Sequence, residues 1–187
     1  MNRECCFVLV PSGRQRIPSG FAINFKRIYR DLVAPALRTA RLHAIRGTER
    51  AGERLFHTAT FDQLLLCEYA VVDLTTADAN IFSHIGIRHA LRPGKTILIL
   101  ARGSQSAFDA SAFGAIFYDL TDGGNLMDTK RVRTALTEEL EKAKGSKPSS
   151  ALFYFLENYT AIAHTKTDVF RDSVHYSSAT KSQLAKA

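Results

Sequence analysis

The chain has 187 residues, of which 45% are hydrophobic and 23% are charged, a composition typical of one globular domain of ordinary size. No segment has the roughly 18 consecutive apolar residues that a membrane helix needs, and "MNRECCFVLV" has no signal-peptide cleavage pattern, so we expect a cytoplasmic protein without membrane contact. The net charge of +7 suits an anionic ligand. Arg and Lys are nevertheless spread along the whole chain, which argues against a nucleic-acid partner.

Apolar runs and amphipathic segments alternate along residues 1–144. The runs "CCFVLVP", "LHAIRG", "YAVVDL", "TILILA" and "AIFYDL" predict five strands. Between and after them, helical spacing predicts helices over "FAINFKRIYRDLVAPAL", which Pro35 should kink or divide, and over "FDQLLLCEY", residues 80–91 and "TKRVRTALTEELEKAK". This alternation predicts an α/β fold of three layers, with a parallel five-stranded sheet in flavodoxin-like, Rossmann-like order.

The composition changes after residue 144. Residues 145–187 begin with the linker "GSKPSS" and continue with segments that predict a C-terminal helical appendage. The segment "ALFYFLENY" is too apolar for a solvated helix. We expect this appendage to dock on the sheet domain, on a protein partner or on a second copy in a homodimer.

Two predicted loops meet where ligands bind such sheets, outside the carboxyl ends of the strands. The first, "PSGRQRIPSG", offers Ser12, Gly13 and Arg14 to a phosphate or carboxylate, although it has no P-loop spacing and also fits a plain surface loop. The second follows the third strand, where Asp73 and Thr75 are placed to bind sugar hydroxyls.

The helix after this second loop carries further candidates. Asp78 and Asn80 complete the turn, and Asn80 fits a helix N-cap as well as a ligand contact. His84 is expected in the first helical turn, facing an open cleft, where the helix dipole keeps its imidazole neutral. Gly86 predicts either close packing of helix on strand or the approach of a ligand.

Metal ligation is not predicted. The cysteines Cys5, Cys6 and Cys67 lack the spacing of metal ligands and indicate reduced core residues, while His84 and His89 diverge around one helix. We expect no metal and no cofactor.

The run "CEYAVVDLTTADANIFSHIGIRHALRPGKTILIL", with "FVLVPSG" upstream and "HTKTDVFRDSVHYSSATKSQLAKA" at the end, resembles bacterial signalling proteins described as TRAFs-binding-domain or TPR-associated. Their Rossmann-like module is shared with the regulatory region of apoptosis signal-regulating kinases. It is more distantly similar to nucleoside 2-deoxyribosyltransferases and TIR domains. The positions that match the motif are Asp73, Asn80, Phe82, Gly86, Arg88 and His89.

The resemblance implies a ligand role for Arg88, and it places on His84 the glutamate that attacks or stabilises the sugar in the enzymes. Of the acidic pair expected after the second strand, only Glu49 remains. We therefore expect a ligand-sensing or interaction domain of a bacterial stress or defence signalling protein, which binds a nucleotide- or nucleoside-like molecule. The alternative is an N-glycosidase, of the deoxyribosyltransferase or NAD-cleaving kind. Its candidate catalytic residues are Glu49, Asp73, Asp78 and His84.

Overall fold

The computed structural model describes residues 4–11, 13–17, 22–47, 63–77, 79–92, 94–104 and 110–145. Its main sheet consists of β1 (Cys5–Leu9), β4 (His43–Arg46), β5 (Tyr69–Asp73), β6 (Thr96–Ala101) and β7 (Ile116–Tyr118). All neighbours pair in parallel, in the order β4-β1-β5-β6-β7. Counted along the chain, these strands run 2-1-3-4-5, so the predicted flavodoxin-like order is confirmed.

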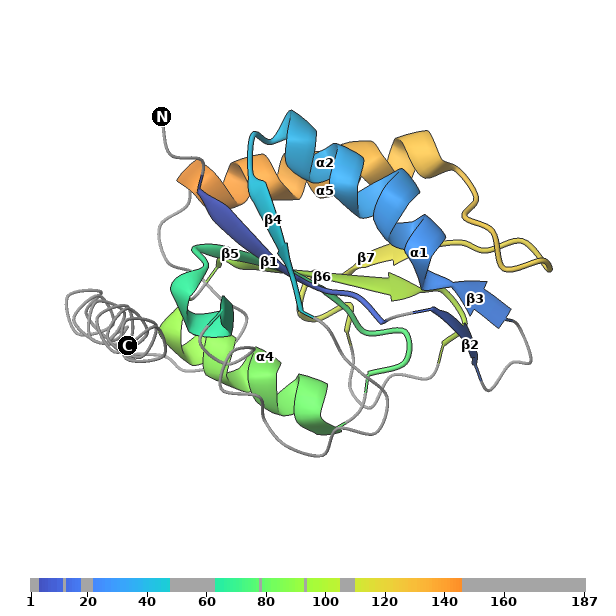
Figure 1. Cartoon of the computed structure of the whole chain (residues 1–187), viewed down its shortest axis with the longest axis horizontal. Coiled ribbons are helices and arrows are strands. Elements are labelled where there is room, and N and C mark those ends of the chain that lie inside the picture. Colours follow the sequence, from blue (N-terminus) through green and yellow to red (C-terminus); the bar gives the residue numbers. More distant parts are fainter. Residues whose placement is uncertain are drawn as a thin grey trace, which may run out of the picture.

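Helices cover both faces of this sheet, so the fold has three layers with the sheet in the middle (Figure 1). One face carries α1 (Phe25–Ile28), η1 (Tyr29–Val33), α2 (Ala34–Thr39) and α5 (Thr129–Gly145). The other carries α4 (Ala79–Leu91) and the helical residues 63–66. Alternate residues of the central strands enter opposite cores, because side chains point to alternating faces of a strand. Thus Val71 packs with α2 and α5, whereas Val72 packs with α4.

Pro35 divides the first helical segment, as the sequence predicts. The backbone forms a π-helix, η1, immediately before α2, and Pro35 lies in the first turn of α2. In an α-helix the nitrogen of Pro35 would donate to the carbonyl of Asp31, but proline has no N–H. Arg133 of α5 instead donates to that carbonyl at 2.8 Å. The missing donor is therefore replaced by a side chain that joins η1 to α5.

The structure corrects the start of the same segment, which the sequence predicts to be helical from residue 21. Residues Ala22–Asn24 form strand β3, which pairs antiparallel with β2 (Arg14–Arg16) in a small second sheet. Ile23 is fully buried, while its neighbours are half-buried. Three residues with one large apolar side chain fit the first turn of a helix as well as a strand, so the hydrophobic periodicity could not distinguish a helix from a strand here.

The long helix α5 closes the described part of the chain. Its buried residues recur three or four positions apart and face the sheet; they are Val132, Leu136, Leu140 and Ala143. The predicted linker and helical appendage, 145–187, lie outside the described residues except for Gly145, which ends α5.

Candidate ligand site at the carboxyl edge of the sheet

The strand order changes direction between β1 and β5. The chain leaves β1 along the face of α1 and α2 to reach β4, and it leaves β5 along the face of α4 to reach β6. In open α/β sheets the connections diverge at such a switch point, and ligands bind beside the carboxyl ends of its strands. Four predicted residues of the described chain lie at or shortly after the carboxyl ends of these two strands, namely Gly13, Arg14, Asp73 and Thr75.

The connection after β1 leads directly into the hairpin of β2 and β3, which lies beyond the carboxyl ends of the strands (Figure 1). Gly13 has a φ of +73°, a conformation that favours glycine. Its carbonyl accepts a hydrogen bond from the Phe25 amide at 3.0 Å, which ties the start of the hairpin to the start of α1. Arg14 follows as the first residue of β2, and its side chain is exposed.

Asp73, by contrast, is only 2% exposed. One carboxylate oxygen accepts the Thr75 amide at 2.9 Å, and the other accepts the Tyr118 hydroxyl at 2.9 Å. The hydroxyls of Thr75 and Tyr118 lie 2.9 Å apart, and the Ala101 amide donates to that of Thr75, also at 2.9 Å. This Asp73 network therefore joins the ends of β5, β6 and β7 on the α5 face of the sheet.

Burial sets the protonation of the Asp73 network. It raises the pKa of Asp73 from 3.8 to about 6, while hydrogen bonds from Thr75 and Tyr118 act in the opposite direction. The pKa of Tyr118 is raised well above its usual value by burial and by the charge of Asp73. Asp73 can thus exchange a proton near neutral pH, but both its oxygens already have protein partners. The observed partners of its carboxylate are thus groups of the strand ends, and a contact with a sugar stays a prediction.

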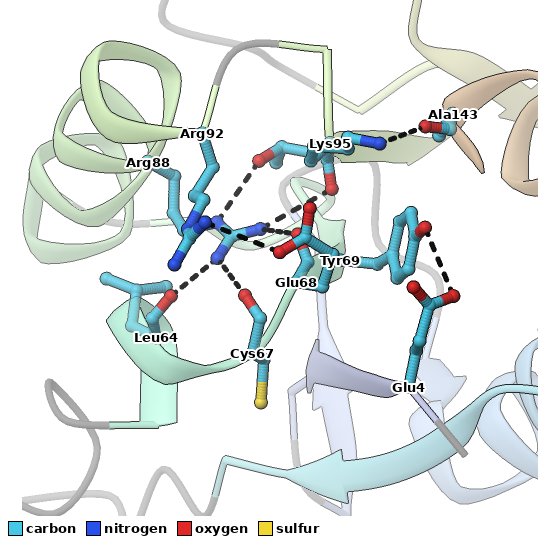
Figure 2. Close-up of polar contacts among 10 residues, drawn as sticks. Glu4, Leu64, Cys67, Glu68, Tyr69, Arg88, Arg92, Lys95 and Ala143 are labelled. Carbon is cyan, nitrogen blue, oxygen red and sulfur yellow. Dashed lines mark hydrogen bonds and ion pairs between the residues drawn. The ribbon is translucent and has the colours of Figure 1, made fainter. Parts of the chain in front are cut away.

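The structure places Arg88, for which the resemblance implies a ligand role, at the amino edge of the sheet, opposite the carboxyl edge (Figure 2). Its side chain is fully buried. Its guanidinium donates to the carbonyls of Leu64 at 2.7 Å, Cys67 at 2.6 Å and Glu68 at 3.0 Å. These carbonyls precede β5, so the contact lies at the amino edge. Arg88 therefore lies at the opposite edge from Asp73 and Arg14. Its guanidinium N–H groups hold the turn that leads into β5.

Further polar contacts surround Arg88 (Figure 2). Arg92 pairs with the Glu68 carboxylate at 3.3 Å, and Lys95 donates to the Ala143 carbonyl at 2.5 Å. Burial lowers the pKa of Arg88 to about 10, with the nearby Arg92 charge as a second cause. The guanidinium therefore stays charged at neutral pH although no carboxylate bonds to it among the described residues, and carbonyl dipoles supply the compensation.

Helix α4 differs from the prediction around its first turns. It begins at Ala79, so Asn80 lies inside the helix and His84 lies in its second turn. His84 is 9% exposed, which corrects the expectation of an open cleft. Gly86 is exposed, and no described atom lies within 4 Å of where its Cβ would be. Close packing of this glycine on a strand is therefore not observed in the described chain, and the approach of a ligand stays a prediction. Helix α4 thus buries His84 and exposes Gly86 to solvent.

His89 is the second buried histidine of α4. It is 8% exposed, and its ring lies 6.1 Å from that of Phe113 in an edge-on arrangement. Burial and then the Arg88 charge lower its pKa, which keeps the imidazole neutral. His89 is therefore a core residue of the α4 layer.

Three candidates, Ser12, Glu49 and Asp78, lie outside the described residues, as does the side chain of Asn80. Sequence reasoning missed Tyr118, which completes the Asp73 network. A signal was present in "AIFYDL", because a tyrosine near the carboxyl end of a predicted strand lies at the same edge as Asp73. The strand order needed to bring the two together was not fixed by that signal alone.

Metal and thiol chemistry find little support in the described residues. Within the described ranges, no group of three or more His, Cys, Asp or Glu side chains could hold a metal ion. The cysteines are free, and burial raises the pKa of Cys67 to about 12 and the pKa of Cys6 further. Such thiols stay protonated and unreactive.

None of the helices in the described part of the chain is long and apolar enough to cross a membrane. No family model, curated protein or solved structure matches this chain.

Proposed function

We propose that the chain binds a nucleotide- or nucleoside-like ligand at the carboxyl edge of its sheet, as the ligand-sensing or interaction domain of a bacterial stress or defence signalling protein. The observation that carries this proposal is the switch point between β1 and β5. Beside it lies the β2–β3 hairpin, which carries the positively charged Arg14 and Arg16. The engaged carboxylate of Asp73 favours binding over glycosidic chemistry. The reduced cysteines fit a cytoplasmic location, and residues 145–187 would contact a protein partner or a second copy.

Thermal unfolding with a panel of NAD, nucleosides and nucleoside monophosphates tests the proposal. A ligand that binds only the native state stabilises it by about 2.7 kcal/mol when present at about 100 times its Kd. We expect at least one member of the panel to raise Tm. If none does at millimolar concentration, the proposed ligand class is wrong.

A matched pair of glycine variants locates the site. Gly13 and Gly114 both have positive φ, and in neither case does a described atom lie within 4 Å of an added Cβ. Gly13 lies at the carboxyl edge, whereas Gly114 precedes β7 at the amino edge. Gly13→Ala should weaken binding and Gly114→Ala should not, although both carry a similar backbone strain. Equal effects would place the ligand elsewhere.

The second candidate function is that of an N-glycosidase, and one observation favours it. The pKa of Asp73, about 6, suits a general acid or base at neutral pH. Incubation with NAD and nucleosides, followed by chromatography of the released base, tests it. Base release that Asp73→Asn abolishes and Arg38→Gln leaves intact would favour the enzyme over the sensor, because Arg38 is an exposed residue of α2.

A further inference from the structure

We infer that the ligand of this edge carries a phosphoryl group, and that Arg14 and Arg16 of the β2–β3 hairpin bind it. The inference rests on the proposed function and narrows it, because a nucleoside without a phosphate would leave both guanidiniums unused. Neither arginine touches the Asp73 network through any contact observed in the described chain.

The two arginines lie on the same face of the hairpin. They are separated by one residue in β2, so both side chains point to one side of the strand, with Cα atoms about 7 Å apart. Both are exposed, whereas Gln15 between them is half-buried and pairs with the buried Ile23. Two guanidiniums at this spacing can approach one phosphoryl group together.

No carboxylate faces this arginine pair across the hairpin. Antiparallel strands often place opposite charges directly across from each other, but here Arg14 is opposite Asn24 and Arg16 is opposite Ala22. Neither arginine forms an ion pair with a described residue. Two other arginines of this edge, Arg102 and Arg131, both pair with Asp119. Among the described residues, the two hairpin arginines thus have no carboxylate partner, whereas Arg102 and Arg131 share Asp119.

The backbone under the arginine pair is held in place from two sides. Ile23 and Phe25 are fully buried, so the inner face of the hairpin belongs to the core. The loop after β7 also packs closely against β3, since a Cβ on Gly124 would lie 2.0 Å from the Ala22 carbonyl oxygen. Arg27 also donates to the Asn125 side chain of that loop. A fixed backbone lowers the ordering cost of binding, which leaves only the arginine side chains to be immobilised.

The chemistry of the guanidinium group favours a phosphoryl group as the anion that this arginine pair binds. Its planar fork matches two oxygens of a phosphate or carboxylate, and hydrogen bonds between charged groups are about twice as strong as neutral ones. A phosphoryl group has enough oxygens to engage both arginines, whereas a single carboxylate presents two oxygens. A nucleoside phosphate also matches a switch point, where open α/β folds bind the phosphates of nucleotides.

Calorimetric titration with the four common ribonucleosides and their 5′-monophosphates tests the inference. For the base that binds, we expect the monophosphate to bind at least about tenfold more tightly than the nucleoside, and inorganic phosphate but not acetate to compete. The variant Arg14→Gln/Arg16→Gln should abolish most of this advantage while leaving the affinity for the nucleoside unchanged.

The matched control is Arg38→Gln/Lys142→Gln, which also removes two exposed positive charges, but at the ends of α2 and α5 near the amino edge. It should keep the phosphate advantage. If nothing in the panel binds the parent protein, the proposed function fails together with this inference. If nucleosides and monophosphates bind equally, if acetate competes as well as phosphate, or if the hairpin variant keeps the advantage, the inference alone is overturned. Arg16→Gln repeats the test with one substitution.

Discussion

Replacing Tyr118 by phenylalanine removes one hydroxyl from the Asp73 network and should destabilise the protein more at high pH than at low pH. In the folded protein the pKa of Asp73 is raised from 3.8 to about 6. A raised carboxyl pKa means that the folded state holds the proton more tightly than the unfolded state. The stability from this group is therefore present below pH 4 and is lost as the pH rises through 6, by about 3 kcal/mol in all.

The Tyr118 hydroxyl donates to the Asp73 carboxylate at 2.9 Å, and this bond favours the ionised form. Without it the folded pKa rises further. A hydrogen bond to a buried charged group contributes about 2 kcal/mol, equivalent to a pKa rise of about 1.5. We therefore expect Tyr118→Phe to cost about 2 kcal/mol more at pH 8 than at pH 4.5.

Urea unfolding at both pH values measures this difference, and groups that titrate alike in parent and variant cancel. Tyr29→Phe is the control, because this half-buried tyrosine lies in the same core and makes no hydroxyl hydrogen bond to a described residue. Asp73→Asn/Tyr118→Phe compared with Asp73→Asn should lose the pH dependence. An equal cost of Tyr118→Phe at pH 4.5 and pH 8 would refute the assignment of this hydroxyl as the donor that stabilises ionised Asp73.

Three further substitutions follow from the geometry. Arg88→Met should cost about 3 kcal/mol or more in urea unfolding, because buried carbonyls lose their donors; a cost below about 1 kcal/mol would contradict this role. Gly124→Ala should lower Tm more than Gly114→Ala, since both have positive φ but only Gly124 would overlap the Ala22 oxygen; equal losses would mean that the loop yields freely. His84→Glu should lower the free energy of unfolding by about 2 kcal/mol or more in calorimetry, because residue 84 is 9% exposed and a buried carboxylate is poorly solvated. An unchanged free energy of unfolding would mean that residue 84 faces an open cleft after all.

Most of the sheet could be predicted from the sequence because its central strands β1, β5 and β6 are continuous apolar runs. The flavodoxin-like order could be predicted because five strands with short loops fit it better than a six-stranded dinucleotide fold. The hairpin could not be predicted in the same way. Its stability depends on Ile23 entering the core and on Gly124 of a distant loop packing against Ala22, and neither contact leaves a periodic signal.

The candidate site was predicted in part. The sequence predicts that Gly13, Arg14, Asp73 and Thr75 lie at the carboxyl edge, and the structure places them there. The sequence could not show which polar side chains at this edge are hydrogen-bonded to other residues of the protein. A strand-end aspartate looks the same whether it meets a ligand or a tyrosine from two strands away.

The carboxyl edge therefore combines two kinds of polar group with opposite relations to solvent. Asp73 is buried and its oxygens are satisfied, so that it stabilises the ends of three strands. Arg14 and Arg16 are exposed and face no carboxylate across their hairpin. A glycosidic mechanism needs the first kind of group to be accessible, because a nucleophile must reach the sugar. Recognition of an anion needs only the second. The distribution of burial and charge at this edge thus favours the proposed binding of a phosphorylated ligand over its cleavage, with Asp73 joined to the ends of three strands.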